Sequence, residues 1–224
     1  FRLPKVLRAN SFYWLPFLIL SFTLIYENMG AYTNYNFEFK KAVNEFLGNS
    51  ENPRYNLWLY NITNKQISTI LYLFLIKSWL EPSKKKYIDW MIAFFILAAL
   101  VLQLTEIEPL YLNQPIIFAM GANMILLGSG LYFVGLISNN RYLDANPFKL
   151  VSFWQMTFLL FTYSLTYINS VALLYLFEVN PQLGMGISYI DVVMGIFNSA
   201  VLVLIIASPL LPRLFEQEPF YESN

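Results

Sequence analysis

The chain has 224 residues, of which 57% are hydrophobic and 12% are charged, about half of the roughly 25% charge of a soluble domain. The formal net charge is zero and the longest basic tract is the three lysines at 84–86, which excludes a nucleic-acid-binding surface. The chain has no cysteine and no histidine, so disulfides, thiolate chemistry and the commonest ligands of transition metals are excluded too. We therefore predict an all-α integral membrane protein with no metal and no cofactor.

Apolar runs of about 20 residues recur along the chain, and this is the length at which a helix crosses a hydrocarbon core of about 30 Å. We expect residues 1–224 to form a single transmembrane domain, a bundle of about six helices. The predicted spans cover residues 11–27, 57–80, 87–104, 115–137, 150–177 and 186–208.

The first span carries Pro16 in its first turns, where helices tolerate proline best. Residues 28–56, which follow it, are polar and rich in asparagine, and are predicted to form an extracytoplasmic loop. Within this loop Phe37, Val43 and Phe46 recur at mixed helical spacing. That spacing favours a short helix lying at the membrane interface.

The second span is unusually polar in its first half, which includes Asn61, Thr63, Lys65 and Ser68. Two interpretations fit this pattern. Either the span starts only near Gln66, or the polar half faces protein and water.

The third and fourth spans are more regular. The third is continuously apolar from Met91, and the fourth opens at Pro115, a residue that suits the first position of a helix. Within the fourth span Gly121, Gly128 and Gly135 recur every seven residues. This glycine stripe predicts close packing against a neighbouring helix, rather than a hinge.

The fifth and sixth spans each carry a polar stripe along one helical face. The first stripe comprises Gln155, Thr162, Thr166 and Asn169, and the second comprises Ser188, Asp191, Gly195 and Asn198. Since polar stripes in lipid face protein or a cavity, we expect both to be covered.

The orientation follows from the distribution of lysine and arginine in the connections. With the N-terminus inside, the cytoplasmic side holds Arg2, Lys5, Arg8, Lys77, Lys84, Lys85, Lys86, Arg141, Lys149 and Arg213. The outer side holds Lys40, Lys41, Arg54 and Lys65. This asymmetry predicts a multi-pass protein of the cell membrane, inner or plasma, with both termini in the cytoplasm and the lipid bilayer as its first partner.

In this topology polar groups of several spans converge in the outer half of the membrane. The candidate residues of an outward-facing, ligand-binding vestibule are Asn61, Lys65, Asn123, Asn169 and Asp191, with Lys65 and Asp191 expected to pair. The alternative is that each of these groups merely bonds to an adjacent helix.

The residues of the chain also argue against catalysis. Glu106 and Glu108 form the closest carboxylate pair, and two residues apart they are typical of a solvated acidic outer loop. The triplet at 128–130 lacks the spacing of a serine nucleophile elbow. We therefore predict a non-enzymatic protein, with no catalytic residue.

Three short motifs carry a resemblance to a known group. They are LWLYNI at 57–62, the lysines at 84–86, and NPF at 146–148 followed by FW at 153–154. With these motifs the chain resembles bacterial six- or seven-span membrane proteins similar to the membrane input modules of sensor histidine kinases. The resemblance implies a signalling role, in which a small amphipathic or apolar ligand, or a membrane protein partner, engages the vestibule. The alternatives are a transporter or channel subunit and an accessory subunit of a larger membrane complex.

Overall fold

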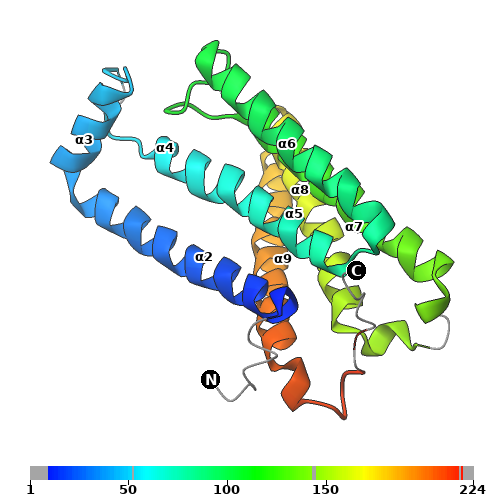
Figure 1. Cartoon of the computed structure of the whole chain (residues 1–224). Coiled ribbons are helices and arrows are strands. Elements are labelled where there is room, and N and C mark those ends of the chain that lie inside the picture. Colours follow the sequence, from blue (N-terminus) through cyan, green and yellow to red (C-terminus); the bar gives the residue numbers. More distant parts are fainter. Residues whose placement is uncertain (1–9, 52, 143–144, 217, 219–224) are drawn as a thin grey trace.

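The computed structural model describes residues 10–51, 53–142, 145–216 and 218, and within them every regular element is helical (Figure 1). The long helices are α2 (Ser11–Tyr35), α6 (Pro82–Leu104), α7 (Pro115–Ser138), α8 (Val151–Val179) and α9 (Pro181–Ala207). A further long helix consists of α4 (Leu57–Tyr60), a π-helical segment (Asn61–Ile67) and α5 (Ser68–Trp79). The shorter elements are α3 (Phe37–Phe46) and the 3-10 turns Asn140–Tyr142, Pro147–Lys149 and Ser208–Leu210.

Each predicted span coincides almost completely with a helix, but three boundaries differ from the prediction by five residues or more. Helix α6 begins at Pro82 instead of residue 87. Helix α2 continues to Tyr35, beyond the expected end at residue 27, until Asn36 accepts a hydrogen bond from the Phe39 N–H and caps α3. Helix α9 begins at Pro181 instead of residue 186, because Asn180 caps it by accepting from the Leu183 N–H. The short helix α3 confirms the helix expected in the polar loop, whose interfacial position stays a prediction.

Three of the described helices are long and apolar enough to cross a membrane: Pro82–Leu104, Pro115–Ser138 and Pro181–Leu210. Each begins with proline in its first turn, where the missing N–H is not needed and the fixed φ favours the helix. Sequence and structure therefore agree on a helical membrane protein.

The helices close into a ring. Helix α2 packs on α5, α5 on α7, α7 on α8, α8 on α9, and α9 again on α2, while α6 covers α5 and α7 from outside. Helix α5 is the best enclosed, with Leu73, Leu75 and Ile76 fully buried. Met156 of α8 and Leu202 of α9 face the same core.

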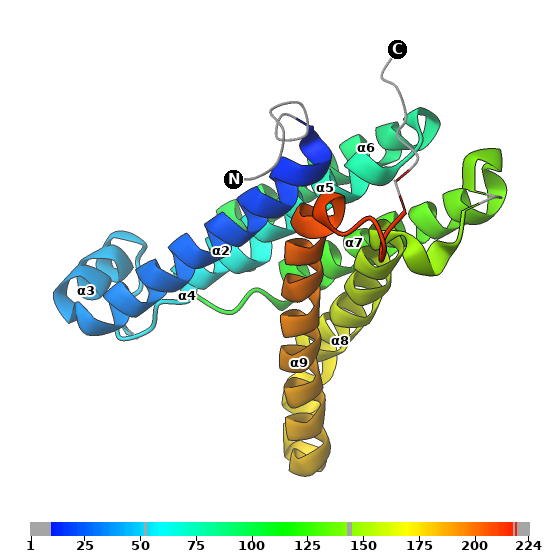
Figure 2. The same ribbon diagram turned by 90° about the horizontal axis from the view of Figure 1, so that it is seen from below.

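The α8–α9 hairpin crosses the other helices at a steep angle, and its turn lies far from them (Figure 2). Apolar side chains near that turn are exposed, as shown by Tyr175, Leu183 and Tyr189. Such a surface needs lipid or another protein against it.

The glycine stripe of α7 packs as predicted. A Cβ atom at Gly121 would lie 2.9 Å from Thr69 Oγ1, and one at Gly128 would lie 3.2 Å from Ile88 Cδ1. These distances confirm that the stripe lets α5 and α6 approach α7 closely.

One end of the molecule is basic, namely the end where α5 and α7 stop and α8 starts. Its loops are tied together by ion pairs. Lys84 pairs with Glu81 at 3.1 Å, Glu81 accepts from Asn139 Nδ2 at 3.1 Å, and Lys149 pairs with Glu216 at 3.2 Å. Hydrogen bonds, that from Lys84 first, hold the pKa of Glu81 below its usual value. We call this the basic end and the opposite one the far end.

Candidate functional site

The polar half of the second predicted span is the π-helical segment Asn61–Ile67. Side-chain hydroxyls bond to backbone carbonyls on both sides: Thr63 Oγ1 donates to Leu59 O at 2.7 Å, and Thr69 Oγ1 donates to Lys65 O at 2.6 Å. π-Helical turns are rare in proteins and frequent at functional sites.

This polar half faces protein. Asn61, Thr63, Lys65 and Ser68 are all buried, and the helix that carries them already begins at Leu57. The prediction that the polar half faces protein is therefore confirmed, since its polar groups are covered by the rest of the chain.

Lys65 lies in a pocket made by the start of α7 and the loop before it. Its side chain is 4% exposed, and Nζ donates to Asn113 Oδ1 at 2.8 Å. The ammonium also lies over two aromatic rings, 4.6 Å from the centroid of Phe118 and 5.5 Å from that of Tyr60. Glu108 is within electrostatic range. The lysine is thus stabilised without a carboxylate in direct contact.

Neighbouring amides bind the same loop. Asn61 Nδ2 donates to Leu110 O at 2.8 Å and to Leu112 O at 2.6 Å. Gln66 Nε2 donates to Gln114 Oε1 at 3.0 Å. We refer to Asn61, Lys65, Gln66, Asn113 and Gln114 as the lysine cluster. Its bonds fasten the α6–α7 loop to the π-helical segment, so its first role is structural.

The prediction that Glu108 belongs to a solvated acidic loop is wrong. Instead of being solvated it is 3% exposed, and its carboxylate accepts from the Ile116 N–H at 2.5 Å and the Ile117 N–H at 2.8 Å. The first N–H groups of α7 have no helical partners, as at the start of any helix, and a carboxylate at a helix N-terminus satisfies them. The strained backbone of Glu106, with φ of +58°, turns the loop toward this cap.

The polar stripes of α8 and α9 were expected to be covered, and several of their residues bond to one another. In the half nearer the basic end, Gln155 Nε2 donates to Asn198 Oδ1 at 2.5 Å, and Asn198 Nδ2 donates to Tyr72 Oη of α5 at 2.8 Å. All three side chains are buried. These three residues, the inner cluster, tie α5 to the α8–α9 hairpin.

Nearer the far end, Asp191 of α9 accepts from Asn169 Nδ2 at 3.0 Å and from Thr166 Oγ1 at 3.3 Å, both of α8. Asp191 and Asn169 are partly exposed, and Asn169 Oδ1 has no hydrogen-bond partner in the described part of the chain. We call these three residues the outer cluster. It differs from the lysine cluster and the inner cluster in that it holds a carboxylate, Asp191, that is partly exposed.

Tyr163 of α8 lies near tyrosines of other helices. The Tyr163 ring contacts that of Tyr72 edge-on, with centroids 5.8 Å apart. The Tyr163 hydroxyl is within electrostatic range of Tyr26, Tyr60 and Asp191. Tyr60 is 42% exposed. The outer cluster therefore adjoins an aromatic, hydroxyl-bearing surface.

The five predicted vestibule residues divide into separate groups. Asn61 and Lys65 belong to the lysine cluster, whereas Asn169 and Asp191 belong to the outer cluster. Asn123 is exposed and donates to a carbonyl of its own helix. The predicted pairing of Lys65 with Asp191 is wrong, because each has other partners and no ion pair joins them.

Several residues of these clusters escaped the sequence analysis. Asn113 and Gln114 precede the α7 proline in a loop, and nothing in their spacing identifies Lys65 as their partner. Tyr72 and Tyr163 belong to apolar stretches in which tyrosine is typical of the core. Asn198, the partner of Tyr72, was visible as a polar residue within a span.

A further polar site lies at the basic end. Glu218 accepts from the Ser152 N–H at 2.9 Å and from Ser152 Oγ at 2.8 Å, and Ser152 Oγ also lies 2.6 Å from Tyr132 Oη. Burial raises the pKa of Glu218 to about 7. This contact docks the segment after α9 on the first turn of α8.

Among the described residues, no group of three or more His, Cys, Asp or Glu side chains is placed to hold a metal ion. We compared the chain with protein-family models, curated proteins and solved structures. No match was found. The geometry of the clusters is therefore the basis on which a function can be inferred.

Proposed function

We propose that the chain is a six-span sensory module of the cell membrane, with both termini in the cytoplasm and no enzymatic activity. The fold supports this topology because every predicted span coincides almost completely with a helix. The positive-inside rule places the basic end in the cytoplasm and the far end outside.

The absence of cysteine makes the topology directly testable. Phe46 in α3 and Leu210 after α9 are both exposed and lie at opposite ends of the molecule. In intact cells, a membrane-impermeant maleimide should label Phe46→Cys and label Leu210→Cys only after the membrane is permeabilised. The reverse pattern, or labelling of both sites before permeabilisation, would refute the orientation.

The observation that carries the functional proposal is the outer cluster. A carboxylate within a membrane helix is expensive and marks a functional site by default. Asp191 has two neutral donors, and among the described residues no lysine or arginine forms an ion pair with it. Tyr60 and Tyr163 lie within electrostatic range of this carboxylate, and aromatic faces attract cations. We therefore assign the site a small amphipathic ligand with a cationic group.

The helix pair that holds the outer cluster reaches the basic end. Helix α8 carries Thr166 and Asn169, then Gln155 of the inner cluster, and starts beside Ser152. A ligand that draws α8 and α9 together at Asp191 would shift this start relative to α7 and the docked Glu218 segment. Two-state rearrangement of packed helices is an ordinary route for such signals.

Thermal unfolding of the full chain in nanodiscs tests the proposal, with hexyltrimethylammonium as the cationic probe and hexyl sulfate as its anionic counterpart. We expect only the cation to raise the unfolding midpoint, and the Asp191→Asn variant to lose this shift. Glu178→Gln is the matched control, because Glu178 is an exposed acid near the turn of the same hairpin. Equal shifts with both probes, or an undiminished shift in Asp191→Asn, would overturn the assignment.

A transporter is the second candidate, and one observation favours it. The polar contacts between α8 and α9 occupy both halves of the hairpin, and buried Gln155 Oε1 has no hydrogen-bond partner among the described residues. Flux of a cation through liposomes containing the chain, abolished by Asn198→Leu, would favour transport over sensing.

A further inference from the structure

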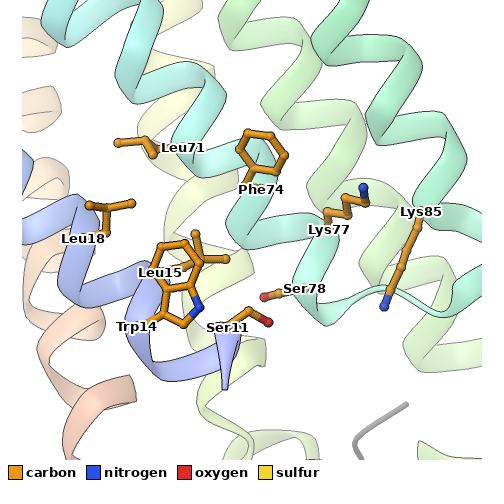
Figure 3. Close-up of a pocket in the computed structure, with 9 residues that line it drawn as sticks. All are labelled: Ser11, Trp14, Leu15, Leu18, Leu71, Phe74, Lys77, Ser78 and Lys85. Carbon is orange, nitrogen blue, oxygen red and sulfur yellow. The ribbon is translucent and has the colours of Figure 1, made fainter. Parts of the chain in front are cut away.

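A groove opens between α2 and α5 near the basic end, with a volume of about 460 Å³ (Figure 3). This volume is within the roughly 300–1,000 Å³ typical of small-molecule sites. Most of its wall is apolar and is formed by Trp14, Leu15, Leu18, Leu71 and Phe74. None of the groups that form the outer cluster contributes to it.

The groove is polarised along its length. Ser11, Ser78 and the nitrogen of Trp14 gather at the end nearest the basic end, while Leu18 and Leu71 lie deeper (Figure 3). Leu71 precedes Ser78 by seven residues on one helix, which is about 10 Å at 1.5 Å per residue. One end of the groove is therefore lined by polar groups, and the part about 10 Å further along is lined by hydrocarbon side chains.

Two lysines complete the polar end, and none of the described residues that line the groove is acidic. Lys77 is neutralised by an ion pair with Asp89 of α6. Lys85 has no acidic partner among the described residues, because Glu81 is bonded to Lys84. The groove thus offers one uncompensated ammonium beside hydroxyl groups.

We propose that this groove binds one anionic glycerophospholipid from the surrounding leaflet. The phosphate lies at Lys85 and the two serine hydroxyls, and an acyl chain lies along Leu18, Leu71 and Phe74. The charge of the polar end selects for the anionic headgroup, since a basic side chain near a membrane attracts anionic lipid. In the orientation proposed above, this is the cytoplasmic leaflet. The site does not depend on the function of the outer cluster.

Native mass spectrometry of the full chain, released from nanodiscs with equal amounts of phosphatidylglycerol and phosphatidylcholine of the same acyl chains, tests this site. We expect bound phosphatidylglycerol to exceed phosphatidylcholine. Lys85→Gln should reduce the excess about fivefold, as expected for loss of one basic residue near the surface. The matched control is Lys86→Gln, since Lys86 is the next residue, lies over the Tyr87 ring and does not line the groove.

A second variant tests the apolar part of the site. Leu71→Trp fills the groove and should lower retention of both lipids, whereas Leu97→Trp, at an exposed leucine of α6, should lower neither. Two results would overturn the proposal: equal retention of the two lipids by the wild type, or the same loss of phosphatidylglycerol in Lys86→Gln as in Lys85→Gln.

Discussion

Alanine substitutions along α7 test how closely its glycine stripe packs, because the three positions Gly121, Gly128 and Gly130 differ in the space available. At Gly121 the new Cβ would meet Thr69 Oγ1 at 2.9 Å and Phe95 Cε2 at 3.2 Å. Thr69 is not free to rotate away, since its hydroxyl donates to a backbone carbonyl.

The magnitudes follow from two opposing terms. Overpacking of this kind lowers the free energy of unfolding by roughly 1–3 kcal/mol. Replacing glycine by alanine within a helix raises it by up to about 1 kcal/mol. Gly121→Ala should therefore destabilise the protein by about 1 kcal/mol. At Gly128 the nearest atoms are isoleucine methyl groups at 3.2 and 3.3 Å, which can move, so the two terms should nearly cancel.

Gly130→Ala is the matched control, because no atom lies within 4 Å of its Cβ position. It should stabilise the protein by up to about 1 kcal/mol. Denaturant unfolding of the full chain in one detergent compares the three variants. If Gly121→Ala proved as stable as Gly130→Ala, the close approach of α5 and α7 would be refuted.

Three further substitutions probe the clusters. Asn198→Leu should cost about 2 kcal/mol in the same unfolding assay, because it removes two interhelical bonds, whereas exposed Ser199→Ala should change stability by less than about 0.5 kcal/mol. Glu108→Ala should cost about 2 kcal/mol through loss of the α7 cap, and exposed Glu51→Ala is its control. Docking of Glu218 raises its pKa from 4.5 to about 7, so the stability that docking adds is fully present below pH 4.5 and is lost as the pH rises through about 7. After correction for intrinsic rates, hydrogen exchange at the start of α8 should quicken from pH 5 to 8 in the wild type and not in Glu218→Gln.

The parts of the fold that sequence predicts are those with a strong periodic signal. Helices α6, α7 and α9 are visible as apolar runs that follow a proline, and hydrophobic length is the dominant constraint in membranes. That the polar stripes of α8 and α9 would be covered was likewise predictable, since a polar stripe in lipid faces protein or a cavity.

What sequence cannot give is the partner of each polar group. Lys65 was expected to pair with Asp191, but its hydrogen bond goes to Asn113, an amide in a loop with no pattern. Glu108 resembled a solvated acid until the position of the α7 N-terminus was known. The π-helical segment was also missed, because nothing in the spacing of its residues distinguishes a π-helix from an α-helix.

The most direct test of the central claim measures whether the outer cluster is reached from outside and is negatively charged. Ser188 lies one turn from Asp191 on α9 and is partly exposed, so Ser188→Cys reports on the site without altering its hydrogen bonds. Cationic and anionic methanethiosulfonate reagents are applied from the outside. The rate at which each modifies the cysteine is divided by its rate with a free thiol in solution. With the negative charge of Asp191 about 5 Å from the cysteine in water, the cationic reagent should react about tenfold faster than the anionic one. We expect this ratio in Ser188→Cys, and a ratio close to one when Asp191→Asn is added. No labelling from outside, or a ratio unaffected by Asp191→Asn, would contradict it.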